Sequence, residues 1–306
     1  MHLDRPLLGI GLMLGFCLTA PFADALAKLL GPSIAVGQLV LLRFVIQAAI
    51  LVPLTVITGR PWKTDGRVLA LIVFRTGLHV AGIATFFTAL LYLPLADAVA
   101  ITYVMPFILL LLGHWFLREE IGWRRVAACV VGFLGALLVV QPAFETVGWP
   151  ALLPVVIAFI FALFMLVTRR IAAATDPIGM QALSAMIALS FLLPAIILNP
   201  FGSVSALEWR HPSLGDWMLI LVMGVSGTAS HLFMTWSLRF APASTVAPMQ
   251  YLEIPFATLV GYAFFSDFPS SLALVGIALT IGAGLFVILR ERHLAQTATM
   301  RPDPNR

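Results

Sequence analysis

The stretch that decides the fold is residues 35–57, which reads AVGQLVLLRFVIQAAILVPLTVI. Arg43 is the only charged residue in it. A helix of this length rises about 35 Å at roughly 1.5 Å per residue, which is enough to cross the roughly 30 Å hydrocarbon core of a bilayer. The stretch therefore predicts a transmembrane helix.

Nine further segments of the 306-residue chain have the same character. The ten predicted spans are 7–30, 35–57, 68–93, 95–117, 126–140, 149–167, 177–198, 217–238, 243–265 and 272–289. The whole chain is 61% hydrophobic and only 10% charged, whereas about 25% of the residues in a soluble domain are charged. We therefore expect an all-α integral membrane protein with ten transmembrane helices and no soluble domain.

Lys and Arg are distributed unevenly between the predicted loops. In a ten-span arrangement with the N-terminus inside, 14 of the 18 fall inside and Arg210 alone falls outside, while Lys28, Arg43 and Arg75 lie within or at the rim of spans. Because cytoplasmic loops are enriched in Lys and Arg, both termini are expected in the cytoplasm. The basic residues form no stripe or cluster, so no nucleic-acid partner is expected.

The two halves of the chain repeat each other at an offset of 148–149 residues. The matched pairs are Pro94 and Pro242, Tyr103 and Tyr251, Pro106 and Pro255, and Gly135 and Gly284. Because each repeat has five spans, an odd number, the second copy must insert upside down. Inverted repeats are typical of secondary transporters, whose binding sites lie near the midplane. We predict five-helix repeats at 7–140 and 149–290, followed by a disordered cytoplasmic tail at 291–306.

Charged residues inside the first spans predict ion pairs. An ionisable group in lipid costs a few kcal/mol unless it is paired or faces water. Asp24 and Lys28 are four residues apart on the first span, and Arg43 should lie at a similar depth on the second. We expect Asp24 to pair with Arg43 and Lys28 to lie beside Asp97, in pairs whose role is structural.

The deepest carboxylate in the chain is Glu253, about ten residues into the ninth span and flanked by Gln250 and Tyr251. Burial disfavours the charged form of a carboxyl group, so Glu253 is a candidate proton carrier or ligand partner. A permanently paired, structural Glu253 is the alternative. Arg75 and His79 lie one turn apart on the third span and are further candidates for the same cavity.

Prolines inside spans favour the transporter interpretation, because each frees a backbone carbonyl and loosens its helix. Pro106 and Pro255 occupy equivalent places in the two repeats, so they predict related kinks near the centre. Tyr103 and Tyr251 could present hydroxyl groups and ring faces there. The chain has no nucleotide-binding loop and no cluster with metal-ligand spacing, so neither a cofactor nor a metal is expected.

The chain resembles the EamA family of the drug/metabolite transporter superfamily. The residues that carry the resemblance are Asp24, Lys28, Arg43, the run LPLADA at 93–98, Pro106, Glu119-Glu120, Gly132 and Gly135, with a weaker second copy at Pro242-Ala243, Glu253, Pro255, Asp267 and Gly276. The second copy departs from the pattern where Asp267 and Pro269 replace the two glutamates. The resemblance implies a ten-span carrier in the inner membrane that alternates access without ATP.

The functional hypothesis is a secondary transporter of a small organic metabolite. The residues expected to line its cavity are Arg43, Arg75, His79, Tyr103, Gln250, Tyr251 and Glu253. Because the charges in the spans balance, the expected substrate is a neutral, ring-bearing molecule, with riboflavin first. S-adenosylmethionine, or another metabolite of the family, is the alternative, since Glu253 could face a sulfonium group.

An intramembrane serine protease is the alternative from a different class. Gly224-Val225-Ser226-Gly227 has the required pattern around a serine. Such a serine needs a histidine within hydrogen-bond reach, and His231 lies only five residues further along the same predicted helix. Close packing of a small-residue helix face is the favoured interpretation of this motif.

Overall fold

Long apolar helices make up most of the protein. The computed structural model describes residues 5–62, 64–103, 105–117, 122–139, 148–199, 204–266 and separate positions between 271 and 289, and these ranges contain no strand. Six helices are long and apolar enough to cross a membrane: α1 (Pro6–Leu30), α2 (Val36–Ile57), α3 (Gly66–Leu90), α8 (Leu153–Ala172), α9 (Pro177–Ile197) and α10 (Leu214–Phe240). The expected class, an all-α multi-pass membrane protein, is confirmed.

The fourth and ninth predicted spans are each broken into two helices. The four pieces are α4 (Leu95–Thr102), α5 (Met105–Leu117), α11 (Ala243–Gln250) and α12 (Glu253–Phe265). Pro106 is the second residue of α5, and Pro255 is the third residue of α12. Proline lacks a backbone N–H and clashes with the carbonyl four residues earlier, so it is tolerated in the first turn, and each helix begins within two residues of its proline. The structure thus has a break where the sequence predicts a kink.

Three further elements are shorter than the six long helices. They are α6 (Trp123–Val139) and the single-turn helices η1 (Trp149–Leu152) and η2 (Ser205–Leu207). The described positions between 271 and 289 are helical, but much of the predicted tenth span and all of the predicted tail at 291–306 lie outside the described residues. The total of ten transmembrane spans therefore stays a prediction.

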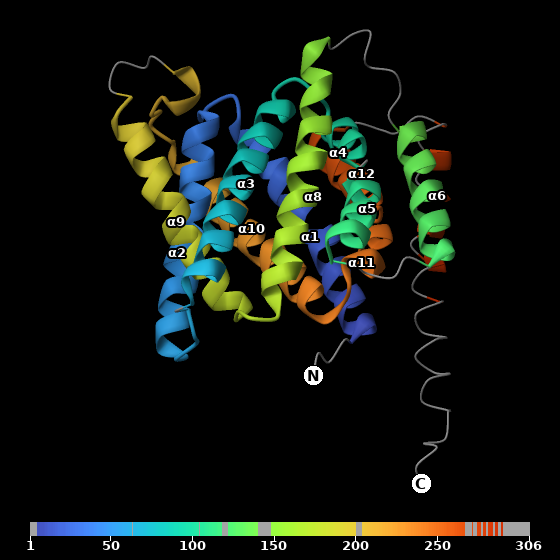
Figure 1. Ribbon diagram of the computed structural model, residues 1–306. Coiled ribbons are helices and arrows are strands. Elements are labelled where there is room, and N and C mark those ends of the chain that lie inside the picture. The colour runs from blue at the N-terminus through green and yellow to red at the C-terminus, as the bar shows by residue number, and fades with distance from the viewer. Residues whose placement is uncertain are drawn as a thin grey trace.

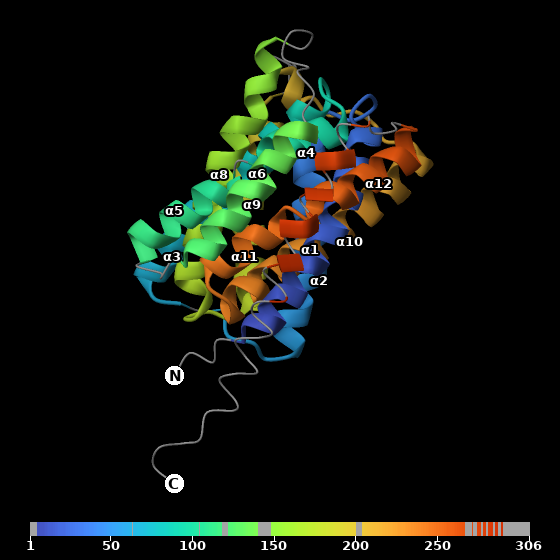
Figure 2. The same cartoon turned by 90° about the vertical axis from the view of Figure 1, so that its right-hand side faces the viewer.

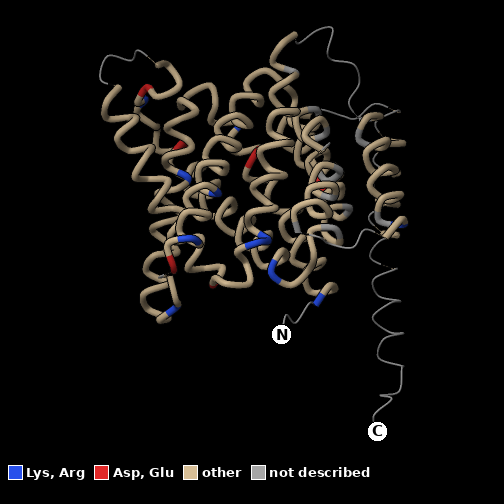
Figure 3. Tube along the Cα trace, viewed as in Figure 1, with Lys and Arg blue, Asp and Glu red and all other residues tan. Residues whose placement is uncertain are grey.

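Basic residues gather at one end of the bundle (Figure 3). The start of α1 and the end of α10 meet there, because the Arg5 amide donates to the Phe240 carbonyl at 2.8 Å. The same end holds the loop from α2 to α3 and the loop from α8 to α9, which an ion pair joins. We call this the basic end, and its cations are Arg5, Arg60, Arg67, Arg169, Arg170 and Arg239.

The helices of the two halves are arranged in matching pairs that run in opposite directions. α1, α2 and α3 correspond in chain order to α8, α9 and α10. At the basic end α1 and α3 begin and α2 ends, whereas α8 and α10 end and α9 begins there. α1 packs along α10 as α8 packs along α3, and α2 packs against α9. Figure 1 shows α2 and α9 at one edge of the bundle and α6 at the other, and Figure 2 shows the bundle from the α6 side.

Candidate substrate cavity

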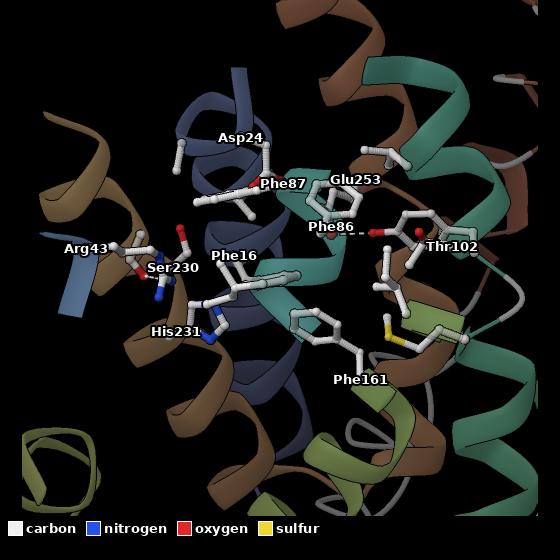
Figure 4. A pocket seen from close by; sticks show the side chains of 18 residues that line it. Phe16, Asp24, Arg43, Phe86, Phe87, Thr102, Phe161, Ser230, His231 and Glu253 are labelled. Atoms are coloured by element: carbon white, nitrogen blue, oxygen red, sulfur yellow. Dashed lines mark hydrogen bonds between the residues drawn. The ribbon is translucent and has the colours of Figure 1, made fainter. Parts of the chain in front are cut away.

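A cavity with about 80 Å³ of space open to the centres of water molecules lies between the two halves (Figure 4). Its position along the helices places it away from the basic end, since it touches the last turns of α3 and the first turns of α8. Every long helix except α9 contributes to it, together with both broken spans. The residues that line it are Phe16, Ala20, Ala23, Asp24, Arg43, Ile83, Phe86, Phe87, Val99, Thr102, Tyr103, Met105, Ile157, Phe161, Gly227, Ser230, His231 and Glu253.

The two helix breaks meet at one side of this cavity. Tyr103 lies directly after α4, and Glu253 is the first residue of α12. The Tyr103 hydroxyl donates a hydrogen bond to the Glu253 carboxylate oxygen Oε2. Both side chains are buried, with exposures of 2% and 7%. The breaks therefore present a phenol and a carboxyl group to the cavity, one from each half.

Arg43 and Asp24 face the cavity from α2 and α1. The Arg43 guanidinium donates through Nη2 to the Gly227 carbonyl on α10 at 3.2 Å. Gly227 leaves the space that the guanidinium fills, because a Cβ there would lie 2.7 Å from Arg43 Nε. In the described part of the chain, no ion pair within 4 Å joins Asp24 to Arg43. The two groups therefore interact only across a longer distance, and both face the cavity.

Lys28 lies further along α1, where its side chain contacts Leu93 and Phe265. Its Nζ donates to the Leu93 carbonyl at 3.0 Å and lies 4.9 Å from the centre of the Phe265 ring. The side chain of Asp97, the expected neighbour, lies outside the described residues, as does that of Pro106. Lys28 does not line the cavity. Its contact with Leu93 joins α1 to the segment just before the fourth predicted span.

His231 forms part of the cavity wall and contacts a second histidine behind it. His231 Nε2 lies 3.2 Å from Nε2 of His79, and both rings are buried. Arg75 lies deeper still, where Nε donates to Thr168 Oγ1 at 2.7 Å and Nη1 donates to Ser184 Oγ at 3.0 Å. Arg75 and His79 were expected in the cavity wall, but the structure places them one layer behind it.

Gln250 and Tyr251 also lie away from the cavity. The Gln250 amide nitrogen contacts the Met165 sulfur at 2.8 Å. The Tyr251 ring packs 5.7 Å from the Tyr103 ring and fills the space beside Gly132 on α6. Of the seven residues expected to line the cavity, three do so: Arg43, Tyr103 and Glu253.

Four phenylalanines that the sequence analysis did not single out form the apolar walls of the cavity. They are Phe16, Phe86, Phe87 and Phe161, from α1, α3 and α8. The chain has 22 phenylalanines, so composition could not single these four out. A usable signal is spacing: Phe16, Ala20 and Asp24 follow one another at one-turn intervals and share a helix face.

Between the cavity and the basic end, polar bonds join α2 of the first half to α9 of the second, and α9 to its neighbour α10. Gln47 on α2 donates to the Gln181 carbonyl on α9 at 2.9 Å, and the Gln181 side chain donates to Thr235 on α10 at 2.9 Å. Further out, Arg60 Nη1 lies 2.8 Å from the Asp176 carboxylate. These bonds close the bundle on its basic side.

Comparison with known proteins shows which family has this architecture. The profile of the EamA-like transporter family matches residues 7–141 and again 148–290. A protein of Rickettsia bellii named S-adenosylmethionine uptake transporter is 26% identical over 285 residues, which are 93% of this chain and 94% of the relative. A protein of Rhizobium johnstonii named riboflavin transporter is 29% identical over 236 residues, covering 76% of this chain and 72% of the relative.

A solved crystal structure has the same fold, with a TM-score of 0.68 at 18% identity over 93% of this chain and 98% of that one. The relatives are named as transporters and not as enzymes. Consistently, no hydrogen bond joins the Ser226 side chain to a histidine among the described residues, and His231 contacts His79 instead. The protease alternative is therefore set aside. The chain belongs to the EamA-like transporter family, and it is a multi-pass membrane transporter of a small molecule.

Proposed function

We propose that the protein moves a small organic metabolite across the inner membrane by alternating access and that the cavity is its binding site. The observation that carries the proposal is the composition of the cavity wall, to which both halves contribute. Hydrogen bonds between helices close the bundle on the basic side of this cavity. Matching helices of the two halves run in opposite directions. If the two halves exchanged their packing arrangements, the cavity would close on one side of the membrane and open on the other.

The proposed topology has ten spans in two inverted repeats, with both termini in the cytoplasm. The concentration of Arg at the basic end supports this orientation, because the cytoplasmic side carries the positive loops. The cavity then lies in the outer half of the bundle. Reporter fusions at each terminus test the proposal: a C-terminal reporter that is active only outside the cytoplasm would contradict it.

S-adenosylmethionine is the substrate that this cavity suits best. Its sulfonium needs aromatic faces or a carboxylate, and its amino-acid group carries one charge of each sign. The cavity offers four Phe rings, the carboxyl groups of Asp24 and Glu253, and the Arg43 guanidinium. Cations are attracted to aromatic faces, and carboxylates pair well with guanidinium groups. The relatives named S-adenosylmethionine uptake transporters align over nearly the whole chain, which supports the same choice.

Riboflavin is the second candidate. The relatives named riboflavin transporters and the aromatic walls of the cavity both favour it. The sequence-based preference for riboflavin was drawn from the balanced charges in the spans, with Gln250 and Tyr251 among the expected cavity residues, and neither of these side chains lines the cavity. Two carboxyl groups in the wall also have no counterpart in a neutral flavin. Riboflavin is therefore ranked second to S-adenosylmethionine as the substrate.

Uptake by purified protein in liposomes tests the substrate. Labelled S-adenosylmethionine is supplied outside, and unlabelled riboflavin, methionine and adenosine are each added as competitors, with protein-free liposomes as the control. We expect saturable uptake that unlabelled S-adenosylmethionine abolishes and riboflavin leaves unchanged. Uptake of labelled riboflavin that S-adenosylmethionine does not reduce would reverse the choice.

A further inference from the structure

Four basic side chains from three helices form a buried cluster behind and beside the cavity. Arg43 comes from α2, Arg75 and His79 come from α3, and His231 comes from α10. Their exposures are 4%, 0%, 0% and 6% respectively. We call these four residues the basic cluster. Arg43 and His231 also line the cavity, so the cluster reaches it.

Two phenylalanine rings hold the cluster together. The Phe44 ring lies 5.6 Å from Arg43 Cζ and 5.2 Å from the His79 ring centre. The Phe164 ring lies 4.4 Å from Arg75 Cζ and 4.7 Å from the His79 ring. His79 therefore stands between the two guanidinium groups, and its direct neighbour is His231.

The hydrogen bonds of the cluster are incomplete. Its acceptors are neutral: the Gly227 carbonyl and the hydroxyl groups of Thr168 and Ser184. Each of the four residues keeps one buried nitrogen that has no hydrogen-bond partner among the described residues, namely Arg43 Nη1, Arg75 Nη2, His79 Nδ1 and His231 Nδ1.

Among the described residues, no acidic group contacts the cluster directly. No carboxylate there lies within ion-pair distance of either arginine. Asp24 faces the same cavity and interacts with Arg43 only across a longer distance, and Glu253 is bonded to Tyr103. A buried guanidinium without a counter-charge is strongly disfavoured, and buried positive charges in proteins are normally paired. The missing partner is therefore negative.

We infer that the basic cluster is a binding site for a small monovalent anionic group, which enters from the cavity between Arg43 and His231. Arg43 Nη1 provides a charge-assisted donor, and Arg75 adds positive charge and donor capacity behind it. A carboxylate or a chloride ion has the required size and charge. If the substrate proposed above is right, its carboxylate is one source of this group, and a free co-ion is the other.

Thermal unfolding of the purified full-length protein tests the site without any transport assay. The wild type is titrated with sodium chloride and with sodium acetate, and sodium isethionate, a sulfonate without a carboxylate, is the control for salt at equal ionic strength. We expect a saturable rise in unfolding temperature with chloride and acetate and none with isethionate. Absence of that difference in the wild type overturns the inference, whatever any variant does.

Variants test whether the rise in unfolding temperature comes from anion binding at the basic cluster. In Arg43→Gln the concentration of acetate needed for half of the effect should rise at least tenfold, and in His231→Gln it should also rise. Arg210→Gln is the matched control, because Arg210 has an exposed side chain that pairs with Glu208 away from the cavity. Equal titrations in the wild type and Arg43→Gln would overturn the assignment to this cluster.

Adding substrate identifies the source of the anionic group. If S-adenosylmethionine removes the response to acetate, while its decarboxylated analogue leaves it, the substrate carboxylate occupies the site. If the response persists with bound substrate, the site holds a separate co-ion. A protein that binds no S-adenosylmethionine but still responds to acetate would contradict the proposed substrate and leave the anion site standing.

Discussion

The hydroxyl of Tyr103 donates a hydrogen bond to the carboxyl group of Glu253, and this bond joins the helix break of one half to that of the other. A loop residue after α4 and the first residue of α12 thus meet beside the cavity. Any motion that separates the halves here must break the bond or carry both residues together. The carboxyl group is therefore suited to couple its protonation to the position of the halves.

Glu253→Gln should separate accumulation from exchange. A neutral amide still accepts a hydrogen bond from Tyr103, but it cannot bind and release a proton. We expect the variant to lose uptake against a concentration gradient and its dependence on an imposed pH gradient, while it keeps exchange of internal for external substrate. Uptake by proteoliposomes at several external pH values measures both. Unchanged pH dependence would remove Glu253 from coupling.

Gly227→Ala should impair transport by displacing Arg43. The new Cβ would lie 2.7 Å from Arg43 Nε, too close for the guanidinium to keep its bond to the Gly227 carbonyl. We expect at least a tenfold loss of uptake, which corresponds to about 1.4 kcal/mol. Gly77→Ala is the control, since a Cβ at Gly77 meets nothing within 4 Å. Equal uptake by the two variants would show that the position of Arg43 is unimportant.

Gly132→Ala should destabilise the protein through Tyr251. A Cβ at Gly132 would clash with the Tyr251 ring, so α6 and the ring must move apart. Overpacking of this kind costs about 1–3 kcal/mol. We expect a lower unfolding temperature for the purified variant, and partial recovery when Tyr251→Leu is added. A double variant no more stable than Gly132→Ala would place the clash elsewhere.

Ser226→Ala should leave transport within about twofold of the wild type, because a secondary carrier needs no nucleophile and Ser226 does not line the cavity. Ser230→Ala is the informative comparison, since Ser230 lines the cavity and its hydroxyl bonds to Thr19 at 2.9 Å. The measurement is initial uptake at equal protein density. Complete loss of activity in Ser226→Ala alone would revive the hydrolase alternative.

Hydropathy and proline positions predicted much of the fold. Unbroken apolar stretches such as 36–57 form helices because only a helix satisfies its own backbone in lipid. The spans containing Pro106 and Pro255 were predicted as single kinked helices, and the structure shows them in two pieces. Periodicity cannot distinguish these outcomes, because apolar residues continue on both sides of each proline.

The site was less predictable than the fold. Glu253, Tyr103 and Arg43 were identified because polar groups at membrane depth are rare and usually face the interior. Depth does not fix the direction in which a side chain points, so Arg75 and His79 were assigned to the cavity although other side chains cover them. The partner of Arg43 depends on the angle between α2 and α10, which the sequence does not specify.

The central claim is that substrate binds in the cavity between the halves, and cysteine protection tests it most directly. In a background where Cys17 and Cys129, both buried, are replaced by alanine, Ala20→Cys places a thiol in the cavity wall and Ser205→Cys places one on the exposed η2. We predict that S-adenosylmethionine slows labelling of the first thiol by a small methanethiosulfonate reagent and leaves the second unchanged. Equal labelling of the Ala20→Cys protein with and without substrate, under conditions where the same protein transports it, would contradict the account.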